Sequence, residues 1–146
     1  MPNSNQLEAA RSKHSKHVPS PKDEPTLRQH DVMDAVVAAC ALVAYADGKA
    51  DTSERNRLLG LMRRVPLLEG FSRQDLDEEF SRHERAFAFD PVHARERALE
   101  TVAALRPNAN EARALVRSCE EIVRADGIAH PLENAALRSI ISALAP

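Results

Sequence analysis

Two short acidic segments of this chain have the residue types and the spacing of a metal site. Residues 46–54 and residues 125–133 both begin Ala-Asp-Gly, and in both a Glu follows the Asp by seven positions. The carboxylates are those of Asp47 and Glu54 in the first segment and of Asp126 and Glu133 in the second. Clustered carboxylates repel one another unless a cation lies between them, and hard divalent cations prefer such ligands. If the two segments pack around a pseudo-twofold axis, we expect the four carboxylates to share one divalent metal ion, with calcium or magnesium favoured.

Two further residues bear on which ion would bind. Asp51 adds a carboxylate to the first segment, and His130 holds the equivalent place in the second. An imidazole at that place would favour a transition metal instead. The sequence therefore leaves two classes of metal ion open: hard divalent cations such as calcium or magnesium, and transition metals.

Helix geometry accounts for part of each segment. The glycine of each segment is typical of a left-handed residue that ends a helix. Glu54 and Glu133 are typical of capping-box acids at the start of the next helix. Asp47 and Asp126 lie at the C-terminal ends of the preceding helices, where a negative charge typically costs a few tenths of a kcal/mol. The functional prediction therefore depends mainly on these two aspartates.

An EF-hand is the obvious alternative for such a segment. Asp-Gly followed by Glu matches positions 5, 6 and 12 of the EF-hand loop. Positions 1 and 3 would then be Val43 and Tyr45 in the first segment, and Ile122 and Arg124 in the second. None of these side chains supplies the missing carboxylates, so we reject the EF-hand.

The similarity of the two segments continues into the residues around them. Apolar residues before and after the first segment align without a gap with apolar residues around the second, which predicts two helix–turn–helix units with the same buried stripe. The aligned residues are Val36, Val37, Cys40, Val43, Leu58, Leu61, Met62 and Val65 in the first unit, and Leu115, Val116, Cys119, Ile122, Leu137, Ile140, Ile141 and Leu144 in the second.

The apolar spacing and the capping residues predict six main helices and no strand. A middle helical pair separates the two units, and Pro91 and Pro131 each mark a first helical position. Asp31 is the expected N-cap of the first helix. The predicted helices cover approximately residues 31–46, 52–65, 73–89, 91–105, 109–125 and 131–144.

Composition limits the class of protein. A chain of 146 residues is long enough for one domain, and the scarcity of aromatic and glycine residues favours helices. We assign residues 1–29, which are polar and proline-rich, to a disordered tail and residues 30–146 to the folded domain. A formal charge of −2 argues against a general nucleic-acid binder, and no apolar run is long enough to insert into a membrane. The chain has no nucleophile–base pair or phosphate loop, so we expect a protein that is not an enzyme.

Several smaller features have a structural and a functional interpretation. Cys40 and Cys119 are expected to be core thiols, with a redox pair as the alternative. His14 and His17 lie in the tail and are interpreted as part of a solvated linker rather than a metal or anion site. Residues 82–97, rich in Arg and His, are interpreted as a solvated face, with a docking patch for an acidic partner as the functional alternative.

The paired motifs resemble the TerB-like family of tellurite resistance proteins. The resemblance covers about residues 32–144 and is carried by Ala-Cys-Ala-Leu-Val-Ala-Tyr-Ala-Asp-Gly at 39–48, by Phe89-Asp90 before a helix, and by Cys-Glu-Glu-Ile-Val-Arg-Ala-Asp-Gly at 119–127, with Glu54 and Glu133. It implies an all-helical domain, a cytoplasmic location, work in stress or tellurite resistance, and a membrane partner of the TerC type. It also implies a divalent-metal site at Asp47, Glu54, Asp126 and Glu133.

These observations together predict a non-enzymatic, metal-responsive stress protein in the cytoplasm. A protein partner would hold it at the inner face of the membrane. The alternative is a metal-free helical interaction module, in which the same Asp and Glu residues serve as helix caps and partner contacts.

Overall fold

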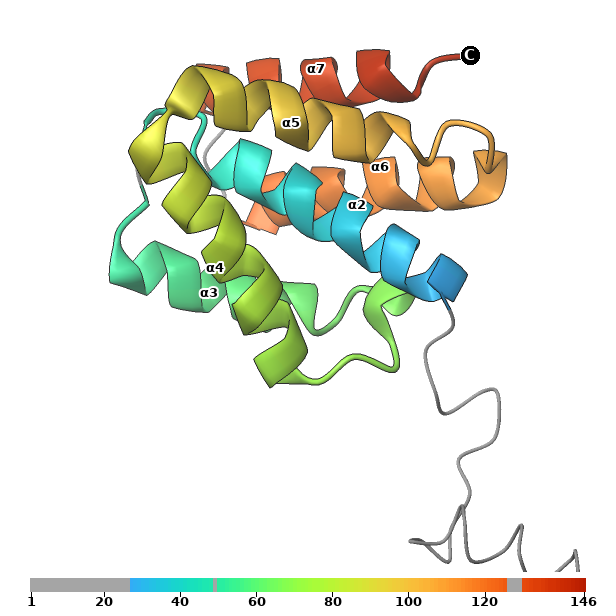
Figure 1. Ribbon diagram of the computed structural model, residues 1–146, viewed down its shortest axis with the longest axis horizontal. Coiled ribbons are helices and arrows are strands. Elements are labelled where there is room, and N and C mark those ends of the chain that lie inside the picture. Colours follow the sequence, from blue (N-terminus) through green and yellow to red (C-terminus); the bar gives the residue numbers. More distant parts are fainter. Residues whose placement is uncertain (1–26, 49, 126–129) are drawn as a thin grey trace, which may run out of the picture.

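A computed structural model describes residues 27–48, 50–125 and 130–146 (Figure 1). This part of the chain is all-helical, so the predicted all-α class is confirmed. Its α-helices are α2 (Leu27–Ala44), α3 (Thr52–Met62), α4 (Arg73–Phe89), α5 (Pro91–Ala103), α6 (Ala109–Ala125) and α7 (Pro131–Leu144), and a 3-10 helix η1 (Pro66–Leu68) follows α3.

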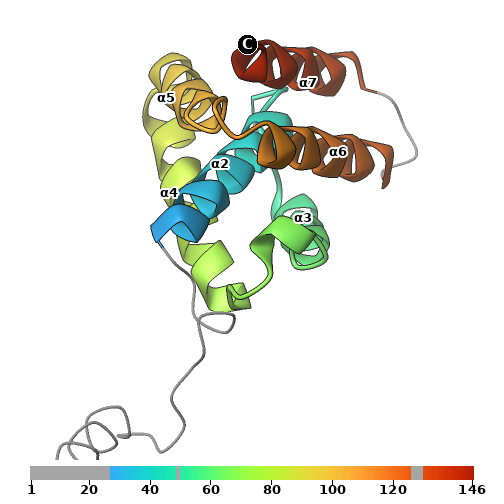
Figure 2. The same cartoon turned by 90° about the vertical axis from the view of Figure 1, so that its right-hand side faces the viewer.

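Helix α2 forms the centre of the fold. Residues 35–43 are all buried, because α2 contacts α4, α5, α6, α7 and η1. In Figure 2, α4 and α5 lie on one side of α2 and α6 on the other. A helix that is apolar all round is stable only when neighbours cover every face, and the many alanines of α2 let those neighbours approach closely. The predicted single apolar stripe was therefore too narrow for this helix.

The start of α2 also differs from the prediction. The helix already covers residues 27–29, which were predicted to belong to the tail, so Asp31 lies inside the helix rather than at its N-cap. Arg28 fixes this first part to the start of α6: its guanidinium donates to Asn108 Oδ1, just before α6, at 2.9 Å and to Glu111 Oε1 in its first turn at 2.8 Å. These partners lie about 80 positions away, so no local sequence signal marks the earlier start. The rest of the predicted tail lies outside the described residues.

The helix starts predicted from capping residues are confirmed in α3, α4 and α5. Asp51 and Glu54 form a capping box on α3, and Ser72 forms one with Asp75 on α4. The side chain of Asp90 caps α5, with Pro91 as its first residue. The turn between α2 and α3, which holds Asp47, is therefore bounded by a well-defined helix start.

The core holds both cysteines. Cys40 and Cys119 are free and buried, and burial raises the pKa of both thiols. Since the thiolate is the reactive form, these cysteines behave as core side chains, as the first of the two interpretations expected. Three residues of the predicted apolar stripe, Leu61, Val116 and Leu137, are only partly buried. Ile141 is 42% exposed, although its aligned counterpart Met62 is fully buried.

Within the described residues, no helix combines the length and the apolar character needed to cross a bilayer.

Candidate functional site

The turn after α2 presents the first aspartate to the surface. The N–H of Gly48 donates to the carbonyl oxygen of Tyr45 at 3.0 Å, and Gly48 has a φ of 103°. Only glycine adopts that backbone conformation without strain, although a Cβ at this position would meet no atom within 4 Å. The glycine thus ends the helix as predicted, and it leaves Asp47 exposed just before it.

The start of α3 places the first glutamate. The N–H of Glu54 donates to Asp51 Oδ1 at 2.8 Å, and the N–H of Asp51 donates to Glu54 Oε1 at 3.1 Å. The Glu54 side chain therefore already has a structural role in capping α3. Its carboxylate still has lone pairs for a second partner, because one N–H occupies only part of its acceptor capacity.

The start of α7 is built differently. His130 is the N-cap, and its Nδ1 accepts a hydrogen bond from the N–H of Leu132 at 3.2 Å. The expected capping box at Glu133 is therefore wrong: an imidazole caps the helix, and Pro131 occupies its first position. Glu133 is half-buried, and its Oε1 is screened from solvent. Asp126 and Gly127 lie outside the described residues.

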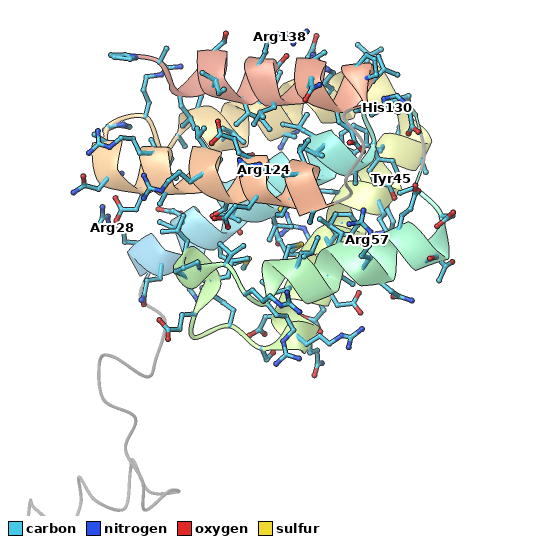
Figure 3. The ribbon with its side chains drawn as sticks, turned by 180° about the vertical axis from the view of Figure 1, so that it is seen from behind. Arg28, Tyr45, Arg57, Arg124, His130 and Arg138 are labelled. Atoms are coloured by element: carbon cyan, nitrogen blue, oxygen red, sulfur yellow. The ribbon has the colours of Figure 1, made fainter. Side chains whose placement is uncertain are left out.

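Three of the four predicted carboxylates border one small cavity of about 40 Å³, which we call the acidic cavity. Asp47 reaches it from the turn after α2, Glu54 from α3 and Glu133 from α7. Arg57 and His130 also border it, and Figure 3 shows both at the end of the molecule where α3, the end of α6 and the start of α7 meet. The apolar part of the lining is Val43, Ala44, Ala50, Leu58, Ile122 and Val123.

The size and the lining limit what the acidic cavity can bind. A water molecule needs roughly 10–15 Å³ of such volume, and drug-sized ligands need roughly 300 Å³ or more. The cavity therefore has room for one ion with a water molecule, and not for an organic substrate. Carboxylate oxygens are suitable ligands for a hard cation, and the guanidinium of Arg57 is a protein cation beside the same carboxylates. Across the described ranges, no three His, Cys, Asp or Glu side chains already form a metal-binding group.

A cluster of side chains that no sequence pattern predicts lies next to this site. Arg55 on α3 donates to Glu84 Oε2 at 2.7 Å, to Asp77 Oδ1 at 2.6 Å and to Ser81 Oγ at 2.9 Å, all on α4. Tyr45 donates to the same Glu84 oxygen at 3.3 Å. This arginine clamp fixes α3 and the turn after α2 against α4. The residues that it joins to α4 lie 22 to 39 positions from their partners, so spacing along one helix does not predict the clamp.

Part of the Arg- and His-rich stretch on α4 and α5 is not a solvated face. Glu79 is buried and pairs with Arg82 at 2.7 Å. His83 lies 3.8 Å from the other oxygen of Glu79, and burial, with the Arg82 charge, lowers the pKa of His83. Burial and the charge of Glu79 raise the pKa of Asp34 on α2. These side chains border a second cavity of about 290 Å³. The interpretation as a solvated face is therefore wrong for His83, whose side chain is 16% exposed, whereas Arg82 is exposed as expected.

Comparison with known proteins gives one match. The family model described as tellurite resistance protein TerB matches residues 33–145, which includes nearly all of the described helices. No curated protein and no solved structure matches the chain.

Proposed function

Because the chain belongs to the family of tellurite resistance protein TerB, we propose that it is a non-enzymatic stress protein that binds one divalent cation at its acidic cavity and docks a partner protein. Family membership supports a helical domain of the tellurite-resistance type. Cation binding and partner docking both go beyond that match. The cation-binding part of the proposal is supported by the arrangement of Asp47, Glu54 and Glu133 around the acidic cavity.

The observation that carries the metal proposal is the convergence of carboxylates from three elements on one ion-sized cavity. Glu54 and Glu133 lie in the first turns of α3 and α7, where the helix dipole stabilises a negative charge. Asp47 lies after the end of α2, where the dipole disfavours its charge. A cation would compensate that cost, and water molecules would complete its coordination, as is usual for calcium and magnesium. Asp126 is the proposed fourth ligand, and His130 beside the cavity would suit a transition metal.

The position of Arg57 supports the alternative proposal, a metal-free interaction module. Its guanidinium borders the acidic cavity and can balance the carboxylates without any metal. The carboxylates would then serve as helix caps and partner contacts.

Calorimetric titration distinguishes the two proposals. Chelator-treated protein is titrated with calcium, magnesium, manganese and zinc, and we expect one ion to bind at one site with a Kd below about 1 mM, equivalent to roughly −4 kcal/mol or better. The variant Asp47→Asn with Asp126→Asn should lose this binding. A matched control, Glu69→Gln with Glu96→Gln, removes two negative charges from exposed positions that do not border the cavity and should bind as the wild type does. Binding weaker than millimolar for all four ions, or unchanged binding in the Asp variant, would overturn the metal proposal.

We propose a cytoplasmic location, with a TerC-type membrane protein holding the domain at the inner face of the membrane. A pull-down tests the partner separately. Retention of that membrane protein by wild-type protein in the presence of a chelator, and its loss in the Asp variant, would favour the metal-free module.

A further inference from the structure

Two exposed apolar side chains on different helices border one hollow of about 360 Å³. Val92, in the first turn of α5, is 70% exposed, and Leu132, in the first turn of α7, is 47% exposed. A single exposed apolar residue is ordinary on a protein surface. Two that border the same hollow on neighbouring helices add exposed apolar surface around a concave site, which is typical of a binding surface. We call this feature the α5–α7 hollow.

The floor of the hollow is apolar and its rim carries a positive charge. Leu42, Phe87 and Ala136 contribute buried surface. Arg95 on α5 is the charged side chain among the lining residues, and its guanidinium donates to Ser139 Oγ on α7 at 3.0 Å. That bond uses one of the five N–H donors of an arginine and holds the group across the two helices. The guanidinium is thus positioned to bind a carboxylate next to an apolar group.

We propose that the α5–α7 hollow docks a segment of a partner protein that presents a large apolar side chain beside a carboxylate. The volume is suited to one or two side chains. One arginine at the rim complements one carboxylate, whereas stable binding to an anionic membrane surface usually needs a cluster of basic residues. The single arginine therefore favours a protein segment over an anionic lipid surface.

The hollow shares two segments of backbone with the acidic cavity. In the turn after α2, Tyr45 and Gly48 border the hollow while Asp47 borders the cavity. In the first turn of α7, Leu132 borders the hollow while Glu133 borders the cavity. A cation that holds Asp47 and Glu133 together would also fix the edge of the hollow. Docking should then be tighter with the cation bound, and this coupling rests on the metal proposal above.

Selection from a random 12-residue peptide library displayed on phage tests the docking chemistry. The immobilised protein is the full chain, and an excess of soluble Leu132→Ser protein removes peptides that bind elsewhere. We expect selected peptides to share a large apolar residue with an Asp or Glu within four positions. No enrichment, or a consensus rich in Lys and Arg, would overturn the proposal.

Fluorescence anisotropy with a selected peptide then tests the site. Leu132→Ser should weaken binding by about tenfold or more, because it removes the exposed apolar side chain that the bound peptide would cover. Ile141→Ser is the matched control, since Ile141 lies on the same helix, is similarly exposed and does not border the hollow. Arg95→Gln should weaken binding by about tenfold, and Arg97→Gln, an exposed arginine of α5 outside the hollow, should leave it within about twofold.

Two other occupants would contradict a protein segment. Leu132-dependent binding to phosphatidylglycerol vesicles would identify a lipid surface. Leu132-dependent dimerisation in sedimentation velocity would identify a second copy of the chain.

The coupling is measured with the same peptide, with a chelator and with a saturating ion from the calorimetric series. We expect peptide binding to tighten by about fivefold or more with the ion in the wild type, and to be unaffected by the ion in the Asp47→Asn with Asp126→Asn variant. Equal peptide affinity with and without a bound ion would overturn the coupling and leave the metal proposal intact. Leu132-dependent peptide binding in a protein that binds no ion would overturn the metal proposal and leave the docking site intact.

Discussion

The first acidic corner, at the start of α3, and the second, at the start of α7, have similar sequences and different surroundings. Glu54 is exposed and closes a capping box with Asp51. Glu133 is half-buried, and His130 caps its helix instead. A carboxylate that caps a helix already has a structural role, whereas a half-buried carboxylate at an ion-sized cavity attracts a bound cation more strongly, because less water screens the two charges. The second corner therefore holds the glutamate on which cation binding should depend more.

The residues next to the two corners also differ, because those next to the first corner make more contacts with other helices. In the aligned sequences Arg55 corresponds to Asn134, and Tyr45 corresponds to Arg124. Arg55 and Tyr45 connect the first corner to α4, and Tyr45 stacks on Phe87 with a ring separation of 5.0 Å. Arg124 is exposed. The first corner is thus fixed by tertiary contacts that the second copy does not repeat at the aligned positions.

The largest expected effect is on cation binding. Glu133→Gln should weaken binding of the ion by about a hundredfold, or ~2.7 kcal/mol, because it removes a half-buried ligand charge. Glu54→Gln should weaken it by about threefold to tenfold, since Glu54 is exposed and shares its carboxylate with the cap. Calorimetric titration of both variants gives the two ratios. A larger loss in Glu54→Gln than in Glu133→Gln would reverse the comparison between the corners.

The second-largest expected effect is on the free energy of unfolding. Arg55→Ala should lower the free energy of unfolding by about 2 kcal/mol, because it breaks charge-assisted bonds to two carboxylates and leaves both without the guanidinium. Asn134→Ala, at the aligned position of the second copy, should change it by less than about 0.5 kcal/mol. Urea denaturation followed by circular dichroism measures both. Similar losses in the two variants would mean that the clamp does not distinguish the corners.

The sequence predicts those features that depend on neighbouring residues. The capping boxes at Asp51 and Ser72, the proline-led start at Pro91 and the glycine turn at Gly48 each follow from three or four adjacent residues, and each is confirmed. The all-helical class follows from the spacing of apolar residues along the whole chain.

Features that depend on distant contacts could not be predicted in the same way. The capping box expected at Glu133 follows the same local rule as the one at Glu54, but His130 supplies the cap and the glutamate lies beside the acidic cavity. Ile141 occupies an apolar position of the repeat, yet it is 42% exposed. Arg55 carries no local signal, because its partners belong to α4. Aligned copies share their sequence pattern, but each copy meets different neighbours.

A smaller effect concerns the caps themselves. Asp51→Ala should destabilise the protein by about 1 kcal/mol, since it removes a preferred N-cap side chain and its hydrogen bond. His130→Ala should lower the free energy of unfolding by a few tenths of a kcal/mol. Histidine is a weaker N-cap than aspartate, and Pro131 has no backbone N–H that needs an acceptor. Thermal and urea unfolding of the two variants in the presence of a chelator isolates the cap from any bound ion. An equal cost at both positions would show that the caps, unlike the clamp, are equivalent.

The smallest change is a shift in one titration, and it reports on the first corner alone. Tyr45 is the single tyrosine in a chain without tryptophan, so tyrosinate absorbance follows this residue only. Burial, with the charge and hydrogen bond of Glu84, raises the pKa of Tyr45 from 10.0 to about 12. The stability that this shift contributes is complete below pH 10 and is lost as the pH rises through about 12.

Glu84→Gln should lower the pKa of Tyr45 toward 10, because it removes the negative charge that opposes ionisation, while burial keeps part of the shift. Glu96→Gln, an exposed glutamate outside the clamp, is the control and should leave the titration unchanged. Circular dichroism recorded at each pH establishes that the helices persist. A wild-type midpoint near 10 in the folded protein would mean that α4 does not close over the first corner, and both corners would then be equally open to an ion or a partner.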